Sequence, residues 1–310
     1  MRFFSESDNL PIGNGGGTCK TLEDVHLFCK TSISMIEIGS ITEKQRDGNT
    51  GNTFHNGSFF TLNSLGMPNG GRLYYEKNLS SMTSLIRDAG KKSMINVAGF
   101  NPEEFSNLTK LAFEKGADFV VLNFGCPNVW ANGQQKGIFS HDTATMKKVV
   151  SLVLTQNTKE ASLGRIGIKL SPLYPSDIVI LSEFLNTLAL GISKGYIGFV
   201  TNINTVPNCS DKESASACIT PGRGLAGMAS TAIRPIAHGQ IQQFRELLHA
   251  NIRIIGAGGV ETGEDAEKML SYGADFVQAT SIYYKKNYDV GVYEEICAQY
   301  MSILESNPIQ

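Results

Sequence analysis

A cysteine between two asparagines is the feature of this sequence that most directly suggests chemistry. Cys126 lies in the run Asn123–Asn128, which reads NFGCPN and follows a short apolar segment. A thiol acts as a base or nucleophile once it is deprotonated, and neighbouring amides both donate to and accept from a heterocycle. A cysteine that only packs is the alternative on composition. The position of Cys126 just past a predicted strand favours a functional role.

Lysine and asparagine residues follow other predicted strands. Lys169 ends an apolar segment, where an ammonium group must reach a charge or solvent because its unpaired burial is costly. Asn63 begins the run NSLGMPN, which ends at Asn69, and Asn204 lies in the run Thr201–Thr205. Each asparagine taken singly fits an ordinary turn. Taken together, amides that donate and accept suit a planar ring with alternating C=O and N–H groups.

Two turns near the end of the chain are suited to an anion. Gly256–Gly259 reads GAGG and precedes a helix start at Thr262. Backbone N–H groups and a helix N-terminus favour negative charge, and Thr280 and Ser281 add hydroxyl donors after the last predicted strand. Barrels often bind phosphate with these last two loops. We therefore predict a phosphorylated ligand.

Composition excludes several other classes of protein. The 310 residues have a formal net charge of −2, so a basic nucleic-acid-binding face is not expected. The chain has no run of ~18 apolar residues and no signal-peptide pattern at its start, and its cysteines have no CxxC spacing. The histidines are scattered, which predicts no protein-built metal site. We expect reduced thiols and a cytoplasmic protein without membrane or nucleic-acid partners.

Short apolar runs, each followed by a helical pattern, must position these residues. Their high content of Val and Ile on both faces is typical of buried parallel strands. The predicted strands are Ile12–Gly15, Met35–Gly39, Ser93–Ala98, Phe119–Phe124, Arg165–Leu170, Gly198–Asn204, Arg253–Gly256 and Phe276–Thr280. The predicted helices are Thr21–Lys30, Leu79–Ala89, Pro102–Lys115, Asp142–Gln156, Pro175–Leu190, Ser230–His249, Gly263–Tyr272 and Val292–Leu304.

This alternation without a break in composition predicts one α/β domain over residues 1–310, a (β/α)8 TIM barrel. An open doubly wound sheet is the alternative, but the first strand lacks a GxGxxG turn followed by an acid. Two segments, Thr42–Tyr74 and Val206–Gly227, fit neither strand nor helix. We expect them to be long loops at the carboxyl ends of the strands, where barrel sites lie.

These motifs together resemble the dihydroorotate dehydrogenase family over nearly the whole chain, from about Asn9 to about Leu304. The run Asn63–Asn69 is similar to the family's substrate loop, and Asn123–Asn128 is similar to its N-x-S-C-P-N motif. A cysteine in that motif is the mark of the family's soluble class. Gly224–Gly227 resembles part of the family's phosphate site.

The resemblance implies an FMN enzyme that oxidises dihydroorotate to orotate in pyrimidine synthesis. Cys126 would be the base that takes a proton from C5 as hydride leaves C6 for flavin N5. The implied substrate-binding residues are Asn63, Leu65, Gly66, Met67, Asn123, Asn128, Asn204, Thr205 and Lys20. The implied cofactor-binding residues are Gly16, Ser40, Asn123, Lys169, Ile203, Gly227, Gly258, Gly259, Thr280 and Ser281. A soluble electron acceptor such as fumarate and a homodimer are also expected.

The chain departs from the family pattern at several places. The soluble class carries a lysine after strand two, in a run that here reads IEIGSIT over Ile36–Thr42. Lys20 would take over the contact to the substrate carboxylate. The segment Val129–His141 is longer than in the family and contains Trp130. Two alternatives therefore stay open: a related barrel acting on another dihydropyrimidine, similar to dihydropyrimidine dehydrogenase or dihydrouridine synthase, and a degenerate flavin-binding barrel.

Overall fold

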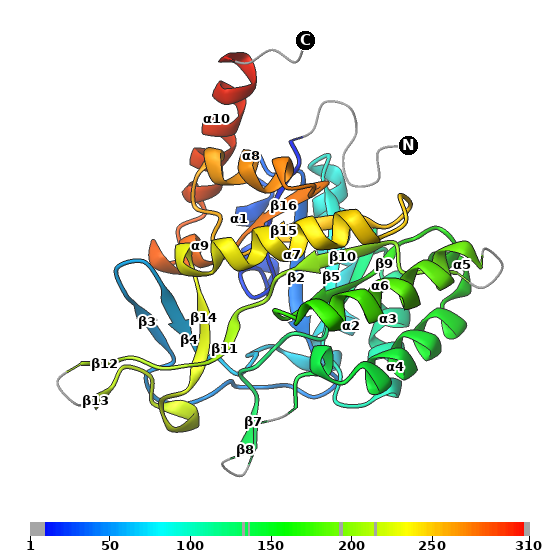
Figure 1. Ribbon diagram of the computed structural model, residues 1–310, viewed down its shortest axis with the longest axis horizontal. Helices are drawn as coiled ribbons and strands as arrows, with labels where there is room; N and C mark the ends of the chain where they lie inside the picture. Colours follow the sequence, from blue (N-terminus) through cyan, green and yellow to red (C-terminus); the bar gives the residue numbers. More distant parts are fainter. Residues whose placement is uncertain (1–9, 132–133, 136, 192–194, 214–215, 307–310) are drawn as a thin grey trace.

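Eight parallel strands close into a barrel that is surrounded by helices (Figure 1). The computed structural model describes residues 10–131, 134–135, 137–191, 195–213 and 216–306. The strand order is β1-β16-β15-β10-β9-β6-β5-β2. The strands are β1 Ile12–Asn14, β2 Met35–Ile41, β5 Lys92–Val97, β6 Phe119–Asn123, β9 Ile166–Leu170, β10 Phe199–Asn202, β15 Arg253–Ala257 and β16 Phe276–Ala279. The predicted TIM barrel is confirmed, with strands that differ from the predicted ones only at their ends, and the open sheet is excluded.

The interior of the barrel changes from apolar to polar along the strands. At the amino ends, Met35, Phe119, Phe199 and Phe276 belong to a separate buried apolar cluster. Side chains two residues apart on a strand share a face. Glu37 therefore follows Met35 into the interior, as Gln278 follows Phe276, and both polar side chains are almost fully buried.

Helices cover the outside of the barrel, and most begin where the sequence predicted. They are α1 Leu22–Phe28, α2 Gly71–Asp88, α3 Pro102–Glu114, α4 Thr143–Gln156, α5 Thr158–Ser162, α6 Pro175–Leu190, α7 Arg234–Leu247, α8 Gly263–Ser271, α9 Ser281–Lys285 and α10 Gly291–Ser306. Short 3₁₀ turns span Phe139–His141, Pro221–Gly224 and Thr231–Ile233. No described helix is long and apolar enough to cross a membrane.

Side-chain caps explain two of the helix starts. The Asn101 side chain accepts a hydrogen bond from the Glu104 N–H at 2.9 Å, and Thr262 forms a capping box with Asp265. The predicted start of α2 at Leu79 was wrong. The helix begins at Gly71. Its first two turns bury only one apolar side chain, Tyr75, while Leu73 is exposed, so the apolar period is not evident before Leu79.

The segments Thr42–Tyr74 and Val206–Gly227 lie at the carboxyl ends of the barrel strands, as predicted, but the prediction that they contain no strand was wrong. Short stretches of these segments pair into a four-stranded antiparallel sheet in the order β11-β14-β4-β3, at the lower left of Figure 1. The strands are β3 Phe54–Asn56, β4 Thr61–Asn63, β11 Val206–Cys209 and β14 Ala226–Ala229. A small hairpin, β12 Lys212–Glu213 and β13 Ser216–Ala217, extends from it. These strands are too short for an alternating pattern, and pairing between distant segments stabilises them.

A second hairpin follows Asn128. It consists of β7 Trp130–Ala131 and β8 Gln134–Gln135, and it projects at the bottom of Figure 1. The side chains of residues 130–136 lie outside the described part of the chain. Of the longer segment Val129–His141, the described residues Val129, Gly137 and Phe139 line a small cavity next to Cys126.

Candidate active site

A cavity lies at the carboxyl ends of the barrel strands, between them and the antiparallel sheet. Its empty volume is about 1040 Å³, including space open to solvent. Among the residues that line it are nearly all of the candidates named from the sequence: Gly16, Lys20, Ser40, Asn63, Leu65, Gly66, Met67, Asn123, Cys126, Asn128, Lys169, Ile203, Asn204, Thr205, Gly258, Gly259, Thr280 and Ser281. Gly227 is not among the lining residues.

One pair of asparagines joins three barrel strands across the cavity floor. Asn123, at the end of β6, donates from Nδ2 to Ser40 Oγ at 2.9 Å. Its Oδ1 accepts from Asn204 Nδ2 at 3.2 Å and from the Gly125 N–H at 3.2 Å. Because Asn123 is buried, these hydrogen bonds fix the orientation of its amide.

A second pair of asparagines joins the barrel to the antiparallel sheet. Asn128 donates from Nδ2 to Asn63 Oδ1 at 2.8 Å, and its Oδ1 accepts from the Gly227 N–H at 3.1 Å. Asn63 lies on β4, whose residue pairing places it opposite Gly227. A side chain at Gly227 would put its Cβ 2.1 Å from Thr205 Oγ1. Gly227 therefore supports two lining residues without lining the cavity itself.

Cys126 lies where this cavity meets a smaller one. The second cavity has an empty volume of about 270 Å³, and Cys126, Met67 and Asn123 line both. The thiol is half-buried. The turn before it is held on both sides: the Gly125 N–H donates to Asn123, and Ser171 Oγ donates to the Gly125 carbonyl at 3.1 Å. Cys126 thus has a defined place beside the amides.

Lys169 reaches a charge that the sequence analysis missed. Its Nζ lies 3.9 Å from Glu37 Oε1, and both side chains are buried inside the barrel. Glu37 also accepts hydrogen bonds from Asn96 Nδ2, at 2.6 Å, and from Gln278 Nε2. A buried carboxylate with these partners compensates the ammonium charge.

Lys20 brings a second ammonium group to the cavity. It follows Cys19, and its carbonyl accepts a hydrogen bond from Tyr75 Oη at 3.1 Å. Burial lowers the pKa of Lys20, although the carboxylate of Asp24 opposes this shift. Lys20 and Lys169 are the charged residues among those that line the described cavity, so the lining favours an anion.

Fold and site together define an enzyme-type (β/α)8 barrel, with an amide-rich, cationic ligand cavity at the carboxyl ends of its strands. A family model described as dihydroorotate dehydrogenase matches residues 4–304, so the chain belongs to the dihydroorotate dehydrogenase family. Enzymes of this family are FMN-dependent oxidoreductases.

Curated relatives agree with this assignment. The chain is 28% identical over 302 residues to a probable dihydroorotate dehydrogenase A (fumarate) of Streptococcus pneumoniae, covering 96% of this chain and 90% of the relative. It is 28% identical over 309 residues to dihydroorotate dehydrogenase A (fumarate) of Lactococcus lactis, covering 97% and 92%.

Solved structures show the same fold. A crystal structure of DHODH from Eimeria tenella in complex with ferulenol superposes with a TM-score of 0.77 at 18% identity, covering 96% of this chain and 82% of that one. The ligand-free type from the same organism gives a TM-score of 0.75, covering 99% and 91%. At this identity the similarity concerns the barrel architecture alone.

The phosphate end of an FMN molecule fits the turn after β15. Gly258 and Gly259 have φ angles of +119° and +86°, a backbone conformation that residues with a side chain rarely adopt. Both glycines line the cavity, as do the hydroxyl-bearing residues Thr280 and Ser281 after β16. A glycine turn that brings backbone amides next to two hydroxyls is chemically suited to a phosphate group.

The ring end of FMN fits the polar floor of the cavity. Three of the buried side-chain oxygens that have no hydrogen-bond partner among the described residues are Asn96 Oδ1, Thr205 Oγ1 and Gln278 Oε1. All three residues line the cavity. Buried acceptors are normally satisfied, so these oxygens suit a ligand that carries N–H groups.

Several lining residues were missed by the sequence analysis. Asn96 and Gln278 were hidden within predicted buried strands, although a polar residue in an apolar run is a usable signal. Phe54 and Thr61 come from the antiparallel sheet that was taken for loop. Tyr284 lies on α9, a short helix that was not predicted.

Proposed function

We propose that this protein oxidises dihydroorotate to orotate with FMN as its cofactor. One observation carries the proposal: the cavity brings Cys126 together with asparagines from four different segments. A pyrimidine ring with alternating C=O and N–H groups is matched by amides that both donate and accept. The family's relatives named dihydroorotate dehydrogenase A (fumarate) support the same substrate.

The cofactor would be held along one side of the cavity. Bound FMN supplies a hydride acceptor at its N5 atom. The residues proposed to hold it are Gly16, Ser40, Asn123, Lys169, Ile203, Gly258, Gly259, Thr280 and Ser281, with Gly227 in a supporting position. Lys169 would place positive charge where the ring system gains negative charge, and preorganised charge of this kind favours the transfer.

The substrate would lie against the amides. Asn63, Asn128, Asn123 and Asn204 are already fixed by mutual hydrogen bonds, so they need little reorganisation on binding. Leu65, Gly66, Met67 and Thr205 would complete this wall. Lys20 would bind the substrate carboxylate.

Cys126 would be the base. It borders the cavity next to Asn123 and Asn128, so a bound ring would present its C5 proton to the sulfur. The asparagine network holds the ring in register with the thiol while the proton moves.

Anaerobic flavin reduction tests this proposal. Dihydroorotate should bleach the FMN absorption of the purified protein, whereas dihydrouracil, which lacks the carboxylate, should not. Cys126→Ala should bind FMN normally and slow the bleaching by about 100-fold or more. Cys209→Ser is the matched control, since Cys209 lies on β11 and does not line the cavity. Unchanged bleaching in Cys126→Ala would exclude the thiol as the base.

The remaining assignments are proposals of the same kind. We propose that residues 1–310 act as one FMN-binding domain in a cytoplasmic homodimer. Fumarate is the proposed electron acceptor, because it appears in the names of the relatives. Reoxidation of the bleached flavin by fumarate under anaerobic conditions tests the acceptor, and light scattering tests the dimer.

A further inference from the structure

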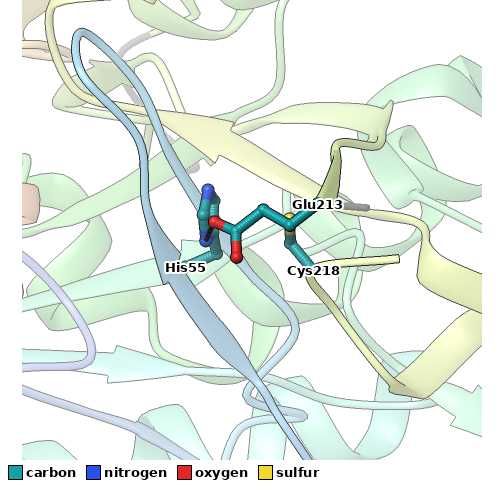
Figure 2. Close-up of side chains that lie close together, drawn as sticks. All are labelled: His55, Glu213 and Cys218. Atoms are coloured by element: carbon teal, nitrogen blue, oxygen red, sulfur yellow. Dashed lines mark ion pairs between the residues drawn. The ribbon is translucent and has the colours of Figure 1, made fainter. Parts of the chain in front are cut away.

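A mixed cluster of metal-ligand side chains lies between strand β3 and the β12–β13 hairpin, apart from the cavity. His55 on β3, Glu213 on β12 and Cys218 just after β13 point toward one another (Figure 2). Their ligand atoms all lie within 4.8 Å of one another. The scattered histidines predicted no metal site from sequence spacing. Spacing could not show this cluster, because tertiary structure brings distant segments together.

Two of the three side chains are largely buried between β3 and the hairpin. Cys218 is only 7% exposed, and the His55 side chain is 16% exposed. The Glu213 side chain is 76% exposed, which leaves an open path from solvent. Phe54 lines the cavity, and successive strand residues face opposite ways, so His55 faces away from the cavity.

The donor set matches zinc. One imidazole nitrogen, one thiolate sulfur and one carboxylate oxygen are ligands that zinc accepts, with a fourth position left for water. Bonds of ~2.0–2.3 Å would place tetrahedral ligand atoms roughly 3.3–3.8 Å apart. His55 Nδ1 lies 3.9 Å from Glu213 Oε1, close to this range, and the exposed Glu213 side chain has room to approach further.

A second carboxylate supports the histidine from its other side. Asp211 Oδ2 lies 3.6 Å from His55 Nε2, while Nδ1 faces Glu213. Metal-binding histidines commonly donate their other ring N–H to a carboxylate, and a slight approach of Asp211 would give this hydrogen bond, which fixes the ring and raises its basicity. The Asp211 carbonyl also accepts from the Cys218 N–H at 2.9 Å, which ties the supporting residue to the cysteine.

We propose that His55, Glu213 and Cys218 form a zinc site, with Asp211 as a residue that positions His55. A divalent cation there would balance the thiolate and the carboxylates and would join the β12–β13 hairpin to β3. This assignment is independent of the reaction in the cavity.

Cobalt(II) titration of the full chain, prepared without a histidine tag, tests the proposal. One equivalent should produce the near-ultraviolet thiolate-to-cobalt absorption band, and zinc should remove it. Cys218→Ser should abolish the band, His55→Ala should weaken cobalt binding at least about tenfold, and Asp211→Asn should weaken it about 10- to 100-fold. Cys209→Ser is the matched control and should bind normally.

The proposal fails if the wild-type protein shows no thiolate band with excess cobalt. It also fails if Cys218→Ser keeps the band. The wild-type titration tests for a thiolate-bound metal even where a variant folds poorly. Circular dichroism identifies a variant that does not fold.

Discussion

The buried pair of Glu37 and Lys169 gives the sharpest prediction on stability. Both charges lie inside the barrel, with 3.9 Å between Lys169 Nζ and Glu37 Oε1. At this distance and an effective dielectric constant of ~20, the attraction is about 4 kcal/mol. Removing one partner leaves the other charge buried and uncompensated, which costs about 3–5 kcal/mol. Glu37→Gln and Lys169→Met should each lower the free energy of unfolding by that amount.

The double variant separates the free energy of the Glu37–Lys169 charge pair from the cost of changing the packing of each side chain. Glu37→Gln combined with Lys169→Met leaves no uncompensated charge, so its cost should fall short of the sum of the two single costs by about 2–4 kcal/mol. Equilibrium urea unfolding, followed by circular dichroism at one fixed FMN concentration, measures all three variants. FMN affinity is measured separately, because a ligand that binds the folded state adds its own stabilisation.

An exposed pair of the same length is the control. Lys110 Nζ lies 3.9 Å from Glu114 Oε1 on the surface of α3, with side chains 67% and 59% exposed. Glu114→Gln should change the free energy of unfolding by at most about 0.5 kcal/mol. The reasoning is refuted if Glu37→Gln costs no more than Glu114→Gln, or if the double variant costs the full sum.

Two further predictions follow from pKa directions. Burial lowers the pKa of Lys20, so the affinity of the enzyme for the anionic substrate should fall as pH rises through a value below lysine's usual 10.5. Lys20→Met should raise the KM for dihydroorotate about 10- to 100-fold without weakening FMN binding. A KM that Lys20→Met leaves unchanged would contradict the role. Burial, with Lys268 and Arg234 nearby, lowers the pKa of His238 in the folded state, so stability should fall as pH drops below the unfolded value of about 6.5. The slope is at most about 1.4 kcal/mol per pH unit, and His238→Gln should reduce it while exposed His26→Gln should not.

The barrel could be predicted from the sequence because its signals are local. Apolar runs such as Phe119–Asn123 and caps such as Asn101 depend on neighbouring residues alone. The antiparallel sheet could not be predicted in this way. Strand β4 has three residues, and its partner β14 lies far along the chain, so only the tertiary fold determines their pairing.

The candidate site was predictable where a motif marks a strand end. Around Asn63, Cys126 and Asn204, polar or thiol-bearing residues follow an apolar segment, and this change of residue type indicates a site at a strand end. Glu37 was not recognised, because it lies within the strand, and the sequence does not say which face of a strand becomes the barrel interior. Asn96 and Gln278 were missed for the same reason.

Glu37, inside the barrel, connects Gly16, in the turn after β1, to the charge balance of the cavity. A Cβ on Gly16 would lie 2.4 Å from Glu37 Oε1, so the carboxylate occupies the space that a side chain would need. Glu37 in turn compensates Lys169. Lys20 forms no ion pair within 4.0 Å among the described residues, and Asp24 Oδ2 accepts from the Lys20 and Thr21 N–H groups. Lys20 therefore has only the electrostatic influence of Asp24, without a close ion pair, so an anionic substrate meets a less compensated counter-charge at Lys20 than at Lys169.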